Sequence, residues 1–266
     1  MGLRVATRAI LIQLLIYAAG ITLIAITCVG IENNRDYVQH ARMMDNIYKQ
    51  TSNSVYPNQN FIYMMQSLVT NVDGEDVSQL LSTASGIAVK NDGNTVYGLT
   101  AGHWCSANPE FSDEEFLKKY APWPSEIQMQ ASFYGRVYEV EVLHSDVVND
   151  ICVVRFNSKF ASKIKTIKPA KKYPKIGEKL YTVSAPLGMY HPYTRFHFEG
   201  YFSGCIDESP YCFYTIPGIE GSSGSGVLNK SGKIVSILDI SVVDFYQITG
   251  GAKLEIIHEV FIIYIP

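Results

Sequence analysis

Short apolar runs separated by turn signals fill the chain from about Phe61 to about Ile248, and this pattern limits the possible folds most. The clearest two runs, residues 86–90 and 95–100, flank Asp92-Gly93, a dipeptide that favours a tight hairpin turn. The chain also has 18 tyrosines and 12 phenylalanines, which are enriched in strands. Short strands at regular spacing predict an all-β fold of barrels or sandwiches. Two further strand regions are expected, at residues 127–143 and 151–156.

A lysine-rich segment divides this region into two β lobes. Residues 161–175 hold six lysines and two prolines, which is typical of a solvated linker; a phosphate-binding patch is the alternative. We expect a first lobe at residues 66–160, the basic linker at 161–175, a second lobe at 176–252 and a C-terminal tail at 253–266. The apolar end of that tail is too short to span a membrane, and we expect it to pack on a lobe.

A long uncharged segment lies near the N-terminus. From Ala9 to Ile31, 23 residues carry no charge, and as a helix they would be about 34 Å long, enough for a hydrocarbon core of about 30 Å. This predicts a membrane anchor at residues 1–31 of a single-pass membrane protein. A cleaved signal peptide and a secreted protein are the alternative. Two arginines precede the segment and two follow it, so only the N-terminal amine favours an extracytoplasmic domain.

Residues 32–65 are polar and broken up, and we expect them to form a stalk between the membrane and the domain. Four of them follow a helical spacing: Tyr37, Ala41, Met44 and Tyr48. This stripe predicts a helix that packs on the domain or on a second copy of the chain, so self-association through the stalk is one expectation. Further along, residues 112–115 have the spacing of a capping box and predict a short helix.

The charge balance excludes one class of partner. Lysine plus arginine total 22 and aspartate plus glutamate total 25, which gives a net charge of −3. Nucleic-acid binding calls for a basic face, which this balance does not predict. The histidines and cysteines lack the spacing of metal ligands, so we expect no metal and no cofactor.

Four cysteines lie beyond the uncharged segment and allow three complete pairings: Cys105, Cys152, Cys205 and Cys212. Cys205 and Cys212 flank the turn-forming residues 207–210 and could bridge. Cys152 lies in a predicted core strand, where a buried free thiol is expected.

Two short motifs could supply a proton acceptor and its partner. His103 follows the strand end Leu99-Thr-Ala-Gly, and a histidine can take and return a proton near neutral pH. Asp150 stands directly before the apolar strand Ile-Cys-Val-Val, and a carboxylate there can hold an imidazole in one tautomer. Alone, either residue has an ordinary structural reading, as a surface histidine and a turn aspartate.

A glycine-rich segment around Ser223 supplies a candidate nucleophile. Residues 218–226 read Gly-Ile-Glu-Gly-Ser-Ser-Gly-Ser-Gly and lead directly into an apolar strand, which argues against a flexible linker. Glycines around a serine allow a tight turn that exposes the hydroxyl and directs backbone N–H groups to one point. Acyl transfer by serine needs a nucleophile, a base and an orienting acid, and the chain supplies Ser223, His103 and Asp150.

Together these motifs resemble those of chymotrypsin-like serine proteases, and most closely the HtrA-type, trypsin-like branch. The resemblance rests on Thr-Ala-Gly-His103, Asp150-Ile-Cys-Val-Val and Gly221-Ser-Ser223-Gly-Ser-Gly, and covers about residues 66–250. It implies a double β-barrel with the site between the barrels, and a membrane-anchored serine endopeptidase that works through an acyl-enzyme on a protein or peptide substrate. Ser223 would be the nucleophile, His103 the base and Asp150 its orienter. The N–H groups of Gly221 and Ser223 would form the oxyanion hole.

The resemblance also suggests residues that bind the substrate. Ser236, Ile237 and Leu238 match the strand that pairs with the substrate backbone. Pro217 stands where trypsin-type enzymes carry an aspartate, so we expect an apolar or small preference rather than cleavage after lysine or arginine. The chain ends about 30 residues after Ser236, so no PDZ domain is expected.

Two alternatives remain open at this stage. The first is a catalytically silent module on the same fold that captures peptides. The second is a structural membrane protein whose stalk drives association, for which Ser223 would be dispensable.

Overall fold

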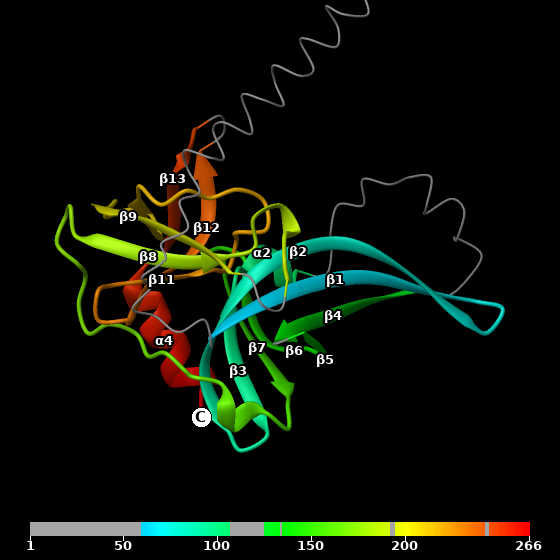
Figure 1. Ribbon diagram of the computed structural model, residues 1–266. Helices are drawn as coiled ribbons and strands as arrows, with labels where there is room; N and C mark the ends of the chain where they lie inside the picture. The colour runs from blue at the N-terminus through cyan, green and yellow to red at the C-terminus, as the bar shows by residue number, and fades with distance from the viewer. Residues whose placement is uncertain (1–59, 107–124, 134, 192–194, 243–244) are drawn as a thin grey trace, which may run out of the picture. The chain divides into compact units, whose positions relative to one another are not determined.

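The computed structural model describes residues 60–106, 125–133, 135–191, 195–242 and 245–266 (Figure 1). The predicted membrane anchor, most of the predicted stalk and the capping-box helix lie outside these residues. Within the described part of the chain, no helix is both long and apolar enough to cross a membrane.

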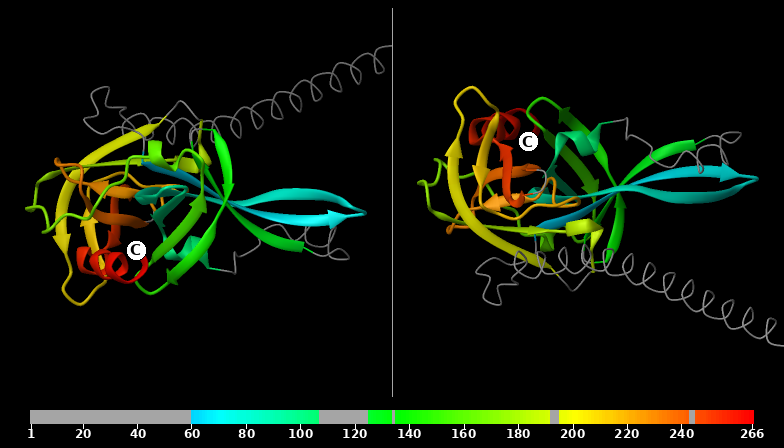
Figure 2. Two further views of the ribbon diagram at one scale, coloured as in Figure 1. Left: turned by 90° about the horizontal axis from the view of Figure 1, so that it is seen from below. Right: turned by 90° about the horizontal axis from the view of Figure 1, so that it is seen from above.

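The first lobe is a seven-stranded sheet in the order β5-β4-β1-β2-β3-β7-β6. β2 and β3 pair antiparallel from Ile87 opposite Leu99 to Asp92 opposite Thr95, which confirms the predicted hairpin. Its strands are β1 (Phe61–Val72), β2 (Glu75–Asp92), β3 (Thr95–Thr100), β4 (Ser125–Phe133), β5 (Arg136–Glu139), β6 (Glu141–Asp146) and β7 (Ile151–Asn157). β1 and β2 form one long hairpin, whose turn lies away from the second lobe (Figure 2). Because β1 begins at Phe61, the β region starts five residues before the expected domain boundary at residue 66.

β5 and β6 are two halves of one run that changes partner at Val140. β5 pairs with β4 and β6 pairs with β7, while the Val140 N–H donates to the Met129 carbonyl oxygen at 2.9 Å. This run therefore contributes the strands at both ends of the sheet, β5 at one end and β6 at the other.

The second lobe is a closed barrel in the order β10-β13-β12-β11-β8-β9. Its strands are β8 (Lys179–Ser184), β9 (Phe196–Cys205), β10 (Tyr211–Tyr214), β11 (Gly226–Leu228), β12 (Ile234–Val242) and β13 (Phe245–Ala252). β8 shows the alternation of buried and half-buried residues that a barrel wall requires. The predicted all-β, two-lobe architecture is thus confirmed.

A shared apolar cluster joins the lobes. It takes Ile87 and Leu99 from the first lobe, Ile237 from the second and Ile257 from α4 (Leu254–Tyr264). The expectation that the C-terminal tail packs on the lobes is therefore confirmed, although the sequence did not predict its helix. The linker is also held by both lobes, because the Ile167 N–H donates to the Ala88 carbonyl and the Ala170 N–H to the Ile234 carbonyl.

Two disulfides are present in the described residues. Cys205–Cys212 joins β9 to β10, as the sequence suggested. Cys105–Cys152 joins α2 (Gly102–Cys105) to β7, so the expected free thiol at Cys152 is wrong. The strand does bury Cys152, but α2 folds back over β7 and brings Cys105 to the same place.

Truncating Ile257 should destabilise the protein, because this fully buried side chain connects α4 with both lobes. We expect Ile257→Ala to lower the free energy of unfolding by about 2–5 kcal/mol. Ile262→Ala on the same helix is the control: Ile262 is 83% exposed, and its loss should change stability by less than about 0.5 kcal/mol. Urea denaturation measures both. Equal losses in the two variants would show that the buried face of α4 does not stabilise the protein.

Removing a disulfide should cost more stability the longer the loop that it closes, with the cost growing as the logarithm of the loop length. The sequence separations are 47 residues for Cys105–Cys152 and 7 for Cys205–Cys212. Loop entropy predicts losses of about 4 and about 2 kcal/mol for the respective double serine variants. Denaturant titration under non-reducing conditions compares the two. A larger loss from the second pair would contradict the chain-entropy explanation.

Candidate active site

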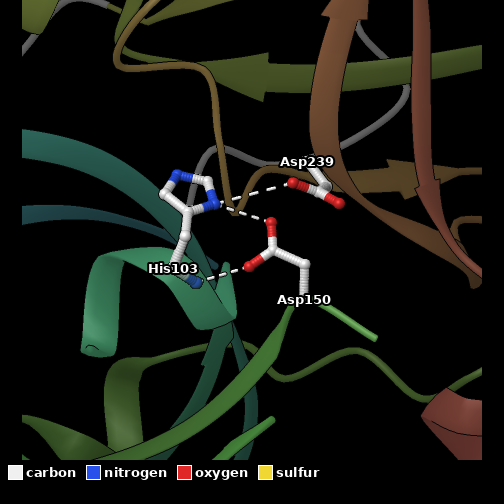
Figure 3. A group of neighbouring side chains, drawn as sticks. All are labelled: His103, Asp150 and Asp239. Atoms are coloured by element: carbon white, nitrogen blue, oxygen red, sulfur yellow. Dashed lines mark hydrogen bonds and ion pairs between the residues drawn. The ribbon is translucent and has the colours of Figure 1, made fainter. Parts of the chain in front are cut away.

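His103 and Asp150 form a hydrogen-bonded pair (Figure 3). The His103 Nδ1 lies 2.6 Å from Asp150 Oδ2, and the His103 main-chain N–H donates to Asp150 Oδ1. The Asp150 side chain is 5% exposed, whereas the His103 side chain is 49% exposed. The carboxylate therefore holds one ring nitrogen from the buried side and leaves the other available for chemistry.

The turn before Asp150 is built by a second aspartate. Asp146 Oδ1 accepts the N–H groups of Val148 and Asn149, both at 3.0 Å, and Oδ2 accepts the Asn149 side-chain amide at 2.6 Å. Burial opposes ionisation of Asp146, but these hydrogen bonds outweigh it and lower its pKa. The turn ends at Asp150, which has a positive φ of 46°. An aspartate tolerates this conformation better than most residues, so the sequence can direct this side chain back towards α2.

The Cys105–Cys152 disulfide runs beside the His103–Asp150 hydrogen bond. Each cysteine lies two residues after its functional neighbour, and both pairs have the same sequence separation of 47 residues. The covalent link thus ties the short helix that carries His103 to the strand that follows Asp150.

Ser223 lies on a tight turn that only glycine can form at two positions. Gly221 has φ +82° and Gly224 has φ +85°. A Cβ on Gly221 would lie 2.4 Å from the Ala185 carbonyl oxygen, and one on Gly224 would lie 2.1 Å from that of Ser85. The turn therefore needs glycine both for its conformation and for the close approach of neighbouring backbone.

Ser85 of β2 connects this turn to the first lobe. Its N–H donates to the Ser223 carbonyl oxygen at 2.8 Å, and its hydroxyl donates to the Gly221 carbonyl oxygen, also at 2.8 Å. The same hydroxyl accepts the Ala185 N–H at 3.0 Å. Ser85 is fully buried, so these bonds are shielded from water.

The N–H groups of Gly221 and Ser223 donate to none of the described residues. The peptide before Gly221 is oriented by the Leu187 N–H, which donates to the Glu220 carbonyl oxygen at 2.6 Å. Because a trans peptide directs its N–H opposite to its C=O, this bond fixes the direction of the Gly221 N–H. Two unpaired donors beside a serine hydroxyl are the arrangement that an oxyanion hole requires.

The Ser223 hydroxyl donates to the main-chain carbonyl of Asp239 at 3.3 Å. Between the described side chains of Ser223 and His103 there is no hydrogen bond. The structure thus assembles the pair of His103 and Asp150, and it places Ser223 on its turn with the hydroxyl directed to β12.

A pocket of about 250 Å³ opens beside Ser223. Its walls include Gly218, Glu220, Ser223, Asp239, Ser241 and Thr249. Pro217, predicted to shape substrate preference, is buried and does not line this pocket.

The predicted substrate strand needs a correction. Ser236 and Ile237 are fully buried and pair with Val227 and Gly226 of β11. The Leu238 N–H and carbonyl are bound to Ser225 and Gly224 of the nucleophile turn, although its side chain lines the pocket. Their backbone groups are therefore occupied. Among the described residues, the free edge of β12 begins after Leu238, because from there the strand pairs with β13 alone.

Asp239 is the functional candidate that the sequence reasoning missed. Its side chain is 4% exposed, and its Oδ1 lies 3.5 Å from His103 Nδ1 (Figure 3). The sequence signal was an acidic residue inside the mostly apolar run from Ile234 to Ile240. Ligand atoms of His103, Asp150 and Asp239 lie within 4.8 Å of one another, and one of these contacts is the 2.6 Å hydrogen bond between His103 Nδ1 and Asp150 Oδ2.

Comparisons with known proteins identify the family and the fold. Residues 84–237, more than half of the 266, match the family model described as a trypsin-like peptidase domain. The structure is similar to a serine endoprotease from Yersinia pestis, with 18% identity and a TM-score of 0.51, over 74% of this chain and 61% of that one. The present chain thus spans about three fifths of that protein's length.

The structure is also similar to a protease from M. tuberculosis solved in its active form, with 10% identity and a TM-score of 0.53, over 77% of this chain and 80% of that one. At these identities the two likenesses show the fold alone. No curated protein matches the sequence. From the matched family model, the chain belongs to the trypsin-like peptidase domain family.

Proposed function

We propose that this chain is a serine endopeptidase that cleaves peptide bonds through His103, Asp150 and Ser223. The observation that carries the proposal is the short contact between His103 and the buried Asp150, close to a serine on a glycine turn with two unpaired N–H groups beside it. Acyl transfer needs all three parts in one place.

The reaction proceeds in two steps. The Ser223 oxygen attacks the substrate carbonyl carbon while His103 Nε2 takes the hydroxyl proton, and His103 returns that proton to the leaving amine as the peptide bond breaks. Water then attacks the acyl-enzyme with the same proton transfers, which releases the acid and restores Ser223. Asp150 keeps the Nδ1 proton in place, so that Nε2 is the nitrogen free to act as base.

The substrate backbone would add to the free edge of β12 at residues 239–241. This edge has no partner strand among the described residues on the side opposite β13. Main-chain hydrogen bonds there would provide affinity, and the pocket beside Ser223 would select the side chain. The small polar walls at Ser241 and Thr249 support a preference for a small or medium side chain.

We further propose that the peptidase is anchored in a membrane by the uncharged segment from Ala9 to Ile31, with its domain outside the cytoplasm. The two disulfides support an oxidising compartment. Secretion after signal cleavage is the alternative, and self-association through the stalk stays a prediction.

A silent peptide-binding module is the second candidate, since the Ser223 hydroxyl donates to Asp239 rather than to His103. Covalent labelling separates the two functions, because only an activated serine reacts with a fluorophosphonate probe.

We expect the full-length chain to be labelled and its Ser223→Ala variant not to be. Ser231→Ala, on the exposed turn before β12, is the matched control and should label like the wild type. Peptidase turnover should fall by roughly four to six orders of magnitude in Ser223→Ala only. A folded wild type that resists labelling would favour the silent module.

Ser85→Ala should weaken both stability and turnover. It leaves the Gly221 carbonyl and the Ala185 N–H without their buried partner, which should cost about 1–3 kcal/mol of unfolding free energy. A displaced oxyanion hole should lower kcat by up to about 100-fold. Ser78→Ala, on an exposed part of the same strand, should change neither. Unaltered kcat in Ser85→Ala would show that the hydrogen bonds of the Ser85 hydroxyl serve stability alone.

A further inference from the structure

Asp239 places a second carboxylate at the same ring nitrogen that Asp150 holds. Asp150 Oδ2 lies 2.6 Å from His103 Nδ1, and Asp239 Oδ1 lies 3.5 Å from it, from the opposite lobe (Figure 3). The pairing of β12 with β13 is irregular between Leu238 and Ile240, so Asp239 lies at a bulge. Bulges redirect a side chain, and this one directs Asp239 towards His103.

Among the described residues, one group lies close enough to offset the negative charge of Asp239. The side chain is 4% exposed, and its Oδ2 is buried without a hydrogen-bond partner among the described residues. Asp150, by contrast, uses both oxygens on His103. A buried carboxylate is costly unless an opposite charge lies close, and the described group able to supply one here is the His103 imidazole.

Among the described residues, no lysine or arginine forms an ion pair with Asp150 or Asp239. Asp150 lies in the turn just before β7 and Asp239 lies in β12, and both are acids. Tyr211 of β10 is near enough to Asp150 for its charge to act on it: burial, and then Asp150 and Asp146, raise the pKa of Tyr211, so it stays a neutral phenol. Among the described residues, His103 is therefore the group beside the two carboxylates that can offset one of their negative charges.

We propose that Asp239 is a second positioning carboxylate for His103, which stabilises the imidazolium formed while Ser223 attacks. The inference rests on the proposed function. The proton leaves the Ser223 oxygen for His103 Nε2, while the Nδ1 proton stays between Asp150 and Asp239. The same proton then passes to the leaving amine, so nothing is consumed. In the resting state the main-chain carbonyl of Asp239 accepts a hydrogen bond from the Ser223 hydroxyl. Asp239 therefore contacts both Ser223 and His103.

A direct test measures the protonation of the His103 ring in a chain that cannot turn over substrate. In the full-length Ser223→Ala chain, NMR follows the His103 ring through a pH titration, with and without Asp239→Asn. An opposite charge this close typically shifts a pKa by about 1–3 units. We therefore expect the midpoint to fall by at least about one unit, a tenfold change in the acid dissociation constant. Glu141→Gln, which removes an exposed carboxylate paired with Arg155, is the control and should leave the midpoint in place.

Kinetics of the active chain give the second readout. Asp239→Asn should move the acid limb of the kcat/KM profile to lower pH and lower the plateau kcat about tenfold, with KM little changed. Asp239→Ser serves as a second variant if the first does not fold. An unmoved midpoint in a folded variant would overturn the proposal. So would a KM change confined to substrates with a lysine or arginine at the cleaved bond, which would make Asp239 a specificity residue.

The two proposals fail in different ways. If the wild type resists the fluorophosphonate probe while the NMR midpoint shifts, the peptidase assignment fails and the coupling of Asp239 to His103 stands. If the probe labels Ser223 and the midpoint does not move, the peptidase assignment stands and the coupling of Asp239 to His103 fails.

Discussion

The buried hydrogen bonds of Ser85 are the interaction on which the site depends. Its N–H and hydroxyl hold the carbonyls of Ser223 and Gly221, and its own carbonyl accepts the Thr100 hydroxyl at 2.7 Å. Thr100 ends the strand that leads to His103. One residue of the first lobe thus fixes the nucleophile turn of the second lobe relative to the histidine, in a place that water does not reach.

Each functional residue is held in place by at least two connections besides the chain itself. His103 is bound to Asp150 through its ring and its main chain, and the neighbouring disulfide links the same two segments. The Ser223 turn is bound to Ser85 on one side and, through Gly224 and Ser225, to Leu238 on the other. Such redundancy limits the freedom of groups that must meet within a few tenths of an ångström.

The parts of the site that the sequence predicted are those with a strong local signal. The hairpin at Asp92-Gly93, the strand after Asp150 and the glycine turn at Ser223 depend on turn chemistry and short apolar runs. The substrate edge was misplaced because the resemblance assigned it to residues 236–238, whereas these are buried and their backbone groups are paired within the second lobe. Likewise, the partner of Cys152 lies 47 residues away, and sequence spacing does not encode that approach.

By itself the sequence determined the strand-forming segments, the division into two lobes and the three residues that we propose for the chemistry, because these follow from local propensity and from residue types that acyl transfer requires. Only the tertiary structure decided what surrounds His103. The β12 bulge brings Asp239 from the second lobe to its ring, and the fold of α2 over β7 pairs Cys105 with Cys152. Both are long-range contacts, set by how the sheets and the short helix pack against each other rather than by the residues beside them in the chain.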